Sequence, residues 1–266
     1  MKKIVCVLLA LCLCVSLFAA CGESESDALT VEAVKEKGTL VIATSPDFPP
    51  FESLQSDGSV VGIEIDLLNI ICEKLGVSLK IEQMNFDSVL PGIQAGKFDL
   101  GASGISVTPE REKNVLFTDP YCLAAQAIVV TADSPITCKA DLEGKAVSVQ
   151  TGTTAESFCM ANGYAVSSFE ANSDAQTALT SGKVDAWVID DLTAADMVAV
   201  YNEENPGALV ILPDAMTTEP YAFAFSQGSD DLVSEINKIV AELVADGTVA
   251  EIFANNNAPY TAPELG

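Results

Sequence analysis

Four polar segments of the sequence each follow a short apolar run and carry groups that could bind a small zwitterion. They lie at residues 44–51, 103–111, 150–154 and 190–191. An arginine side chain and the free amide groups at a helix start suit a carboxylate, whereas an aspartate suits an ammonium group. Arg111 and Asp190 are therefore candidates for the two ends of an amino acid site.

Each of these residues also has a purely structural interpretation. Arg111 taken alone is more typical of a surface residue, and Asp190 could cap the helix that follows it. Phe48 and Phe51 would ordinarily lie in a core. Their occurrence at successive strand ends favours the binding interpretation, because ligands of open α/β sheets bind where the carboxyl ends of the strands meet.

The apolar periodicity predicts two α/β lobes, each with a mostly parallel sheet flanked by helices. We expect strands over 40–43, 77–81, 99–102, 147–149 and 186–189, and helices over 65–75, 89–95, 154–160, 175–179 and 192–200. Residues 95–99 and 181–185 are similar phrases, in which a helix ends at a Gly before a strand. This internal similarity indicates that the two lobes are related.

The expected domain organisation follows from these elements. Two extended segments, 127–131 and 222–225, are expected to cross between the lobes, so that C-terminal helices over 232–243 and 249–253 return to the first lobe. We expect a signal peptide over 1–20, a tether over 21–37, lobe 1 over 38–124 and 224–257, lobe 2 over 125–223, and a C-terminal tail over 258–266.

The N-terminal region has the pattern of a secretory signal. Two lysines precede an apolar run over residues 4–20, which is marginal in length for a membrane span. The small residues before Cys21 make this junction similar to a bacterial lipobox, although Phe18 stands where Leu is usual. We therefore expect an extracytoplasmic protein anchored to the cell membrane by a lipid on Cys21. The alternative is an ordinary signal followed by a chance cysteine.

Composition excludes several classes of function. The chain has 266 residues, with 13 Lys and Arg, 38 Asp and Glu and no His, so its formal net charge is −25. That charge disfavours nucleic acid, because phosphates would be repelled. Without His there is no Ser–His or Cys–His nucleophile pair and no His-ligated metal site. Carboxylate or lysine chemistry remains open.

Four cysteines remain once the signal and Cys21 are set aside. They are Cys72, Cys122, Cys138 and Cys159. Three pairings are possible and the spacing favours none, so disulfides stay an open question. No Cys-x-x-Cys phrase occurs, which disfavours a thiolate metal site.

From Gly38 to Asn255 the sequence resembles the bacterial extracellular solute-binding proteins (family 3) of polar amino acid ABC transporters. The matching phrases are PPFE at 49–52, VGIEIDL at 61–67, GKFD at 96–99, TPER at 108–111, FTDPY at 117–121, GTT at 152–154, VDA at 184–186 and ADGT at 245–248. The set in this order is specific, whereas no single phrase is. The resemblance implies a type II periplasmic-binding-protein fold, with two lobes joined by two hinge strands.

The resemblance also implies a ligand site formed by both lobes. In such a site Arg111 binds the ligand carboxylate together with Ser106 and the backbone of Gly104. Thr154 adds its backbone N–H from lobe 2, and Asp190 binds the ammonium group. The full set of predicted ligand-binding residues is Ser45, Phe48, Phe86, Gly104, Ser106, Arg111, Thr154 and Asp190.

The side chain of the ligand would lie between two aromatic rings. The resemblance assigns these rings to Phe48 and to Phe86, which is expected just before the second helix. Family members that take cationic amino acids often have Asp where this chain has Ser45. We therefore expect a ligand whose side chain lacks a positive charge, although Glu52 could turn inward and supply the missing carboxylate.

The implied function is transport. An amino acid would dock on lobe 1, the lobes would close over it, and the permease subunits of an ABC importer would recognise the closed form of this monomer, with no cofactor and no metal. The alternative is an enzyme on the same scaffold, similar to the secreted cyclohexadienyl dehydratases, for which Glu52 and Glu219 are the candidate acids. A receptor sensor would need a signalling domain, which no pattern here indicates.

Overall fold

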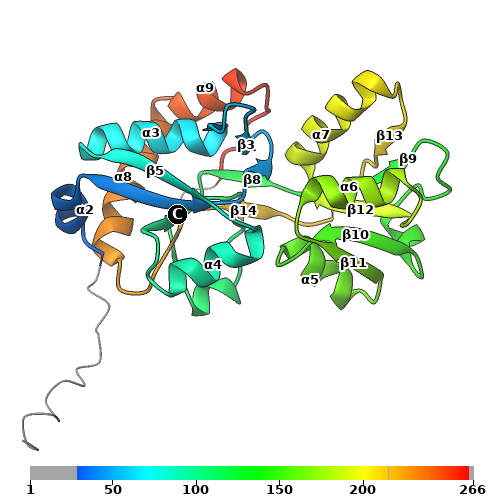
Figure 1. Ribbon diagram of the computed structural model, residues 1–266, viewed down its shortest axis with the longest axis horizontal. Helices are drawn as coiled ribbons and strands as arrows, with labels where there is room; N and C mark the ends of the chain where they lie inside the picture. The colour runs from blue at the N-terminus through cyan, green and yellow to red at the C-terminus, as the bar shows by residue number, and fades with distance from the viewer. Residues whose placement is uncertain (1–28, 215, 264–266) are drawn as a thin grey trace, which may run out of the picture.

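The computed structural model describes residues 29–214 and 216–263. The expected signal peptide, Cys21 and residues 22–28 of the expected tether lie outside these residues. The chain forms two lobes side by side, each built on a five-stranded sheet with helices on both faces (Figure 1). Within the described residues, no helix has the length and hydropathy that crossing a membrane requires.

The sheet of lobe 1 has the strand order β5-β1-β6-β15-β7. Strand β1 is parallel to β5 and β6, whereas β15 is antiparallel to its neighbours. Helices α3 and α9 cover one face and α4 covers the other (Figure 1). The elements are α2 (Val31–Lys37), β1 (Thr39–Thr44), α3 (Ile63–Leu75), β5 (Ser78–Gln83), α4 (Phe86–Gln94), β6 (Leu100–Gly101), η1 (Arg111–Lys113), β7 (Leu116–Phe117), β15 (Ala224–Phe225), α8 (Asp230–Ala245) and α9 (Thr248–Asn255).

The sheet of lobe 2 has the strand order β11-β10-β12-β9-β13. Strand β10 is parallel to β11 and β12, and β9 is antiparallel to both of its neighbours. Helices α6 and α7 lie on one face and α5 on the other (Figure 1). The elements are β9 (Gln126–Thr131), η2 (Lys139–Leu142), β10 (Ala146–Gln150), α5 (Thr154–Ala161), β11 (Ala165–Phe169), α6 (Asn172–Thr180), β12 (Ala186–Asp190), α7 (Asp191–Glu204) and β13 (Leu209–Ile211).

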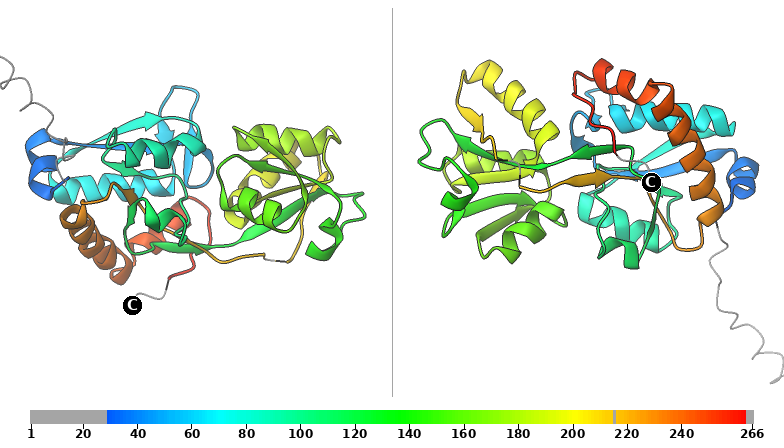
Figure 2. Two further views of the ribbon diagram at one scale, coloured as in Figure 1. Left: turned by 90° about the horizontal axis from the view of Figure 1, so that it is seen from below. Right: turned by 180° about the vertical axis from the view of Figure 1, so that it is seen from behind.

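Two antiparallel strands connect the lobes. They are β8 (Cys122–Ala124) and β14 (Glu219–Tyr221), which run side by side between the lobes in Figure 2. The prediction of crossings at 127–131 and 222–225 is wrong, because these segments lie in β9 and around β15, inside the two sheets. Both segments are almost fully buried. A continuous apolar run is typical of a strand that is buried on both faces of a sheet.

The expected tether is too long, because helix α2 belongs to the fold. The Thr30 hydroxyl accepts from the Ala33 N–H and caps the first turn, which is a standard start for a helix. Val34 is buried, and the Val31 N–H donates to Asp231 at the start of α8. The folded chain therefore includes residues 31–37.

The described part of the expected tail also packs on the fold. The Tyr260 ring lies 4.9 Å from that of Phe253, centroid to centroid, and its hydroxyl donates to the Tyr121 carbonyl. The Leu123 N–H donates to the Thr261 carbonyl (3.0 Å). Residues 258–263 thus form a strap over lobe 1 beside strand β8.

Most helices are longer than predicted, and α4 and α7 show why. Helix α4 begins at Phe86, three residues earlier than expected, so Phe86 is its first residue rather than a residue before it. Helix α7 runs to Glu204, four residues beyond the predicted end. The prediction stopped short because the last turn is polar and has no apolar periodicity. The periodic helix α3 matches the prediction closely, and Gly76 ends it with a left-handed φ of 75°.

The four cysteines in the described residues are free thiols. Burial raises the pKa of Cys72 to about 11 and that of Cys159 to about 12. These thiols therefore stay protonated and act as small apolar core residues.

Candidate functional site

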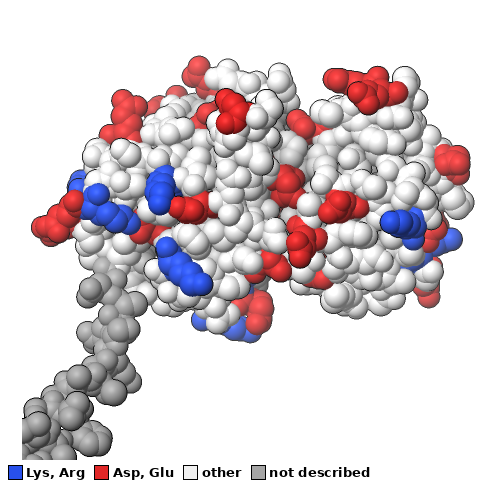
Figure 3. Space-filling view, in the orientation of Figure 1, with Lys and Arg blue, Asp and Glu red and all other residues white. Residues whose placement is uncertain are grey.

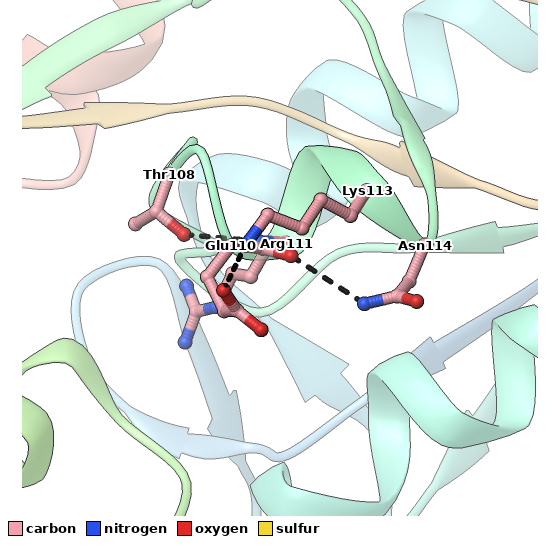
Figure 4. A network of polar contacts seen from close by, with 5 residues as sticks. All are labelled: Thr108, Glu110, Arg111, Lys113 and Asn114. Atoms are coloured by element: carbon pink, nitrogen blue, oxygen red, sulfur yellow. Dashed lines mark hydrogen bonds and ion pairs between the residues drawn. The ribbon is translucent and has the colours of Figure 1, made fainter.

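Arg111 projects from a short turn that its neighbours hold in place. Its backbone N–H donates to the Thr108 hydroxyl (3.2 Å), and the Asn114 amide donates to the Glu110 carbonyl (3.4 Å). Lys113 pairs with the Glu110 carboxylate on the exposed side of the turn. Figure 4 shows the guanidinium pointing away from these contacts. The turn therefore presents the arginine to the other lobe.

The guanidinium of Arg111 joins the two lobes. It donates to the Ser106 carbonyl in lobe 1 (2.9 Å) and to the Gly152 carbonyl in lobe 2 (3.1 Å). Its central carbon lies 5.6 Å from the centre of the Phe86 ring. Burial lowers the pKa of Arg111 and the carboxylate of Glu219 opposes that effect, but a guanidinium stays charged throughout.

Asp190 is the last residue of β12. Like Arg111, it lines a narrow cavity between the two lobes. It occupies the N-cap position of α7, but its side chain makes no capping hydrogen bond to that helix. The Tyr221 hydroxyl donates to Oδ2, whereas Oδ1 has no partner among the described residues. Burial, followed by the charge of Glu219, raises the pKa of Asp190 to about 7. A buried acceptor without a donor is costly unless a ligand supplies one.

Seven of the eight predicted site residues lie together around one narrow cavity between the lobes, and Ser45 does not. The cavity of about 20 Å³ has room for roughly one water molecule, so an amino acid can enter only if the lobes separate. The residues that line it are Phe48, Phe86, Ser103, Gly104, Ser106, Arg111, Gln150, Thr153, Thr154 and Asp190.

Gly104 lets the backbone pack closely against the Phe48 ring, but it offers no free N–H donor to a ligand. A Cβ at this position would lie 2.4 Å from Cε1 of Phe48, and φ is 53°, so a side chain is excluded twice over. Its N–H already donates to the Glu64 carboxylate (3.2 Å). The expectation that the backbone of Gly104 completes the carboxylate cradle therefore cannot rest on its amide.

The Ser45 hydroxyl faces a carboxylate instead of the cavity. It donates to Oδ1 of Asp47 (2.9 Å), whose Oδ2 accepts from the Asn172 N–H at the start of α6 (2.7 Å). The Gln150 amide also donates to Asp47 (3.3 Å). Asp47, on the short strand β2 (Asp47–Phe48) of lobe 1, thus bonds to two elements of lobe 2.

The start of helix α5 forms the lobe 2 side of the cavity. Thr153 caps the helix by accepting from the Glu156 N–H (3.1 Å), and Thr154 is the first helical residue. The Thr154 hydroxyl accepts from the Gln126 amide (2.9 Å). First-turn amides have no partner inside a helix, so the backbone N–H of Thr154 stays the predicted carboxylate donor.

The sequence prediction missed several residues at this site. Ser103, Gln150 and Thr153 lie in the polar segments identified from the sequence, and only their local position was lacking. Asp47 lies in such a segment too, but its partners are in the other lobe. Tyr221 carried no signal, because its contact with Asp190 depends on the two lobe-connecting strands.

Acidic side chains dominate the surroundings. In the view of Figure 3 they are spread over both lobes, and several lie at the junction between them. With a net charge of −25, the molecule attracts cations to its surface at low salt. Among the residues that the structure describes, no group of three or more Cys, Asp or Glu could hold a metal ion.

Comparison with known proteins places these features in context. The family described as bacterial extracellular solute-binding proteins, family 3, matches residues 40–256. The arginine-binding extracellular protein ArtP of Bacillus subtilis is 32% identical over 257 residues, which are 95% of this chain and 96% of ArtP.

Two solved structures share the fold over most of the chain. A mutant of ArgBP from T. maritima has a TM-score of 0.79 and 37% identity, covering 85% of this chain and 98% of that one. The ancestral amino acid-binding protein AncCDT-1, described as a precursor of cyclohexadienyl dehydratase, has a TM-score of 0.78 and 32% identity, with the same two coverages.

Proposed function

The chain belongs to the bacterial extracellular solute-binding proteins of family 3, and on that premise we propose that it binds a free amino acid between its lobes and delivers it to an ABC importer. Because the family is extracellular, the protein acts outside the cytoplasm. Its lobes, each built on its own sheet and joined by two strands, suit closure around a ligand.

The unpartnered oxygen of Asp190 is the observation that carries this proposal. It belongs to a residue that lines the cavity together with the Arg111 guanidinium from lobe 1 and the start of α5 from lobe 2. An α-ammonium group would give Asp190 its missing donor, and an α-carboxylate would take Arg111 and the helix amides. Free amino acids carry both groups on one carbon, so they match this pair of ends.

We propose that the ligand carries a positively charged side chain. The α-carboxylate of a bound amino acid balances the charge of Arg111, and its α-ammonium group balances that of Asp190. The carboxylates of Asp47 and Glu219 near the cavity are then left without a balancing charge. This surplus of negative charge favours a cationic tail. Asp47 therefore takes the place of the carboxylate that Ser45 lacks, which reverses the expectation from Ser45 alone. The arginine-binding relative ArtP supports the same ligand class.

Calorimetry with a panel of amino acids tests both statements. Arginine, lysine, glutamine, cystine and methionine are titrated at physiological salt, and arginine or lysine should bind most tightly. Arg111→Ala and Asp190→Ala should each weaken binding by roughly 30-fold or more, because each leaves a buried charge without its partner. Lys113→Ala, in the same turn as Arg111 but exposed, is the control. Unchanged affinity in either cavity variant would remove that residue from the site.

We also propose that a lipid on Cys21 anchors the protein to the membrane. Two acyl chains hold a protein at a bilayer firmly, whereas one is marginal. Cys21→Ala should move the protein from the membrane fraction to the soluble fraction and abolish its labelling by a radioactive fatty acid. Retention in the membrane with the label intact would refute the anchor.

A second candidate function is that of a dehydratase, which the likeness to AncCDT-1 favours. Asp190, with a pKa of about 7, could donate a proton at neutral pH. Glu219 lies near it, but Glu52 is fully buried behind Ser103 and does not line the cavity. Incubation with a cyclohexadienyl amino acid decides the question, because formation of an aromatic product would indicate an enzyme and saturable binding without product would indicate transport.

A further inference from the structure

Two fully buried glutamates lie directly behind the ligand cavity in lobe 1. Glu52 is on β3 (Glu52–Leu54), which joins β2 and β4 (Val60–Val61) in a small sheet, and Glu64 is in the first turn of α3. Neither side chain is exposed, and the described residues give neither glutamate an ion-pair partner. Two buried carboxyl groups in contact cannot both be ionised without a large cost.

The hydrogen bonds favour an ionised Glu64 over an ionised Glu52. Glu64 accepts from the Tyr121 hydroxyl through Oε1 (2.6 Å) and from the Gly104 N–H through Oε2 (3.2 Å). Among the described residues, Glu52 accepts only from the Ser103 hydroxyl, through Oε1 (2.9 Å), and its Oε2 has no donor. The donor-free oxygen of Glu52 is therefore the place for a proton, which it can donate to Glu64.

We propose that Glu52 and Glu64 share one proton, and that this carboxyl pair positions the corner of the amino acid site formed by Ser103 and Gly104. Ser103 links the pair onward, because its hydroxyl oxygen accepts from the Ser45 N–H (3.0 Å). Both corner residues line the cavity. The positioning role rests on the proposed amino acid site, whereas the shared proton does not.

The electrostatic surroundings agree with this geometry. Burial and the adjacent Glu64 raise the pKa of Glu52 well above its ordinary value, and Asp47 adds to the effect. Burial also raises the pKa of Glu64, although its hydrogen bonds from Glu52, Tyr121 and Gly104 oppose the rise. The remaining titratable neighbours are Tyr121 and Cys122, so within the described part of the chain no facing group supplies a positive charge.

Loss of the shared proton would disturb the cavity. A raised pKa means that the pair stabilises the fold fully at low pH and that this contribution is lost as the pH rises through the raised value. Two adjacent charges would then repel, and Glu52 and Glu64 hold Ser103 and Gly104 respectively. Ligand affinity should therefore fall at alkaline pH.

Infrared spectroscopy of the ligand-free protein tests the shared proton. At pH 8, where Asp190 is mostly ionised, the wild type should retain the C=O stretching band of one protonated carboxyl group. The band should disappear in Glu52→Gln and persist in Glu73→Gln, an exposed position on the same helix as Glu64. A wild type without the band, or a band unchanged in Glu52→Gln, would overturn the proposal.

The two glutamines should also differ in binding. Glu52→Gln keeps both roles, since its amide donates to Glu64 and its carbonyl accepts from Ser103, so affinity at pH 7 should stay within roughly threefold of wild type. Glu64→Gln places an NH₂ group against one of the two donors, Tyr121 or Gly104, and should cost at least about tenfold. Circular dichroism checks that both variants fold.

The pH profile separates positioning from simple packing. Above the pKa of the pair, wild-type affinity relative to Glu52→Gln should fall by roughly tenfold per pH unit, a ratio that cancels ionisation of the ligand. Parallel profiles, or equal losses in the two glutamine variants, would refute the positioning role. If the wild type binds no amino acid, the proposed function fails, while the infrared band still decides the shared proton.

Discussion

Ligand affinity should fall steeply on acidification because Asp190 must be ionised to bind an ammonium group. Its pKa of about 7 in the ligand-free protein means that half of the molecules hold a proton there at neutral pH. An ammonium group beside Asp190 favours the ionised form, so binding below pH 7 expels that proton. Between pH 8 and pH 5 the ionised fraction falls about 100-fold, which corresponds to about 2.7 kcal/mol of binding free energy.

Calorimetry between pH 5 and pH 8 at constant ionic strength measures this loss. In buffers of different ionisation enthalpy, binding at pH 6 should release about 0.9 protons. Asp190→Asn should bind more weakly but with a nearly flat profile over this range. Wild-type affinity that changes less than about threefold from pH 5 to pH 8, without proton release, would refute the assignment of Asp190 as the ammonium site.

Acid unfolding cannot mimic this result through Asp190. The folded-state pKa of Asp190 is raised from 3.8 to about 7, so its contribution to stability is complete below the unfolded value and is lost as the pH rises through 7. The ligand-free protein is thus favoured by acid at this residue, whereas the complex is disfavoured. Opposite trends in thermal stability with and without ligand would separate the two effects.

Three further substitutions test other contacts at the cavity. Tyr221→Phe removes the hydroxyl donor that favours ionised Asp190. The acid limb of the affinity profile should therefore move to higher pH by roughly one pH unit. A limb at the wild-type pH would contradict this role of Tyr221. Asp47→Asn weakens the hydrogen bond from the first amide of α6, which helps to hold the lobes closed. Stopped-flow fluorescence should show ligand dissociation faster by roughly tenfold with association unchanged. A slower association instead would contradict this role of Asp47 in lobe closure. Gly104→Ala forces a Cβ onto Phe48 and should reduce the free energy of unfolding by roughly 1–3 kcal/mol in a urea titration, whereas full stability would show that the ring can move aside.

The secondary structure was predictable where one face of an element is buried. Helix α3 places its apolar residues at helical spacing and ends at Gly76, so pattern and cap agree. Helix α5 follows the same logic, with Ala155 and Cys159 buried on one face and a cap at Thr153. Helix α2 was not predictable in this way, because Val34 is its one fully buried residue and seven residues give little periodicity.

The prediction of the segments that connect the lobes was wrong for a different physical reason. Strand β9 is apolar because it lies inside the sheet of lobe 2, and an apolar run alone does not say which sheet buries it. The real connection, β8 and β14, includes Cys122 and Tyr221, which are as buried as any core residue. Burial pattern therefore cannot distinguish a hinge strand from a core strand.

The sequence pointed to residues that line the cavity where a local segment positions them. Arg111 could be placed because its turn is built by nearby residues, and Asp190 because it ends a buried strand. Asp47 was missed, since its contact with the Asn172 N–H spans 125 residues and exists only when the lobes meet. Long-range polar contacts of this kind carry no periodic signature in the sequence.

The buried carboxyl groups of Asp190, at the cavity, and of Glu52 and Glu64, behind it, should together produce a bell-shaped dependence of affinity on pH. Asp190 sets the acid limb, since the ligand needs it ionised, and the pair of Glu52 and Glu64 sets the alkaline limb, since the site needs its proton. Glu52 and Glu64 are not among the groups that shift Asp190, nor is Asp190 among those that shift the pair, so the limbs should be independent.

Variants should therefore remove one limb at a time. Asp190→Asn should flatten only the acid side, Glu52→Gln only the alkaline side, and the double variant both, with additive losses of binding free energy. Calorimetry of the four proteins from pH 5 to pH 9 measures each limb with the same ligand. A change of both limbs in either single variant would show that the carboxyl groups are coupled across the cavity, and the separation of ammonium binding from cradle positioning would then be wrong.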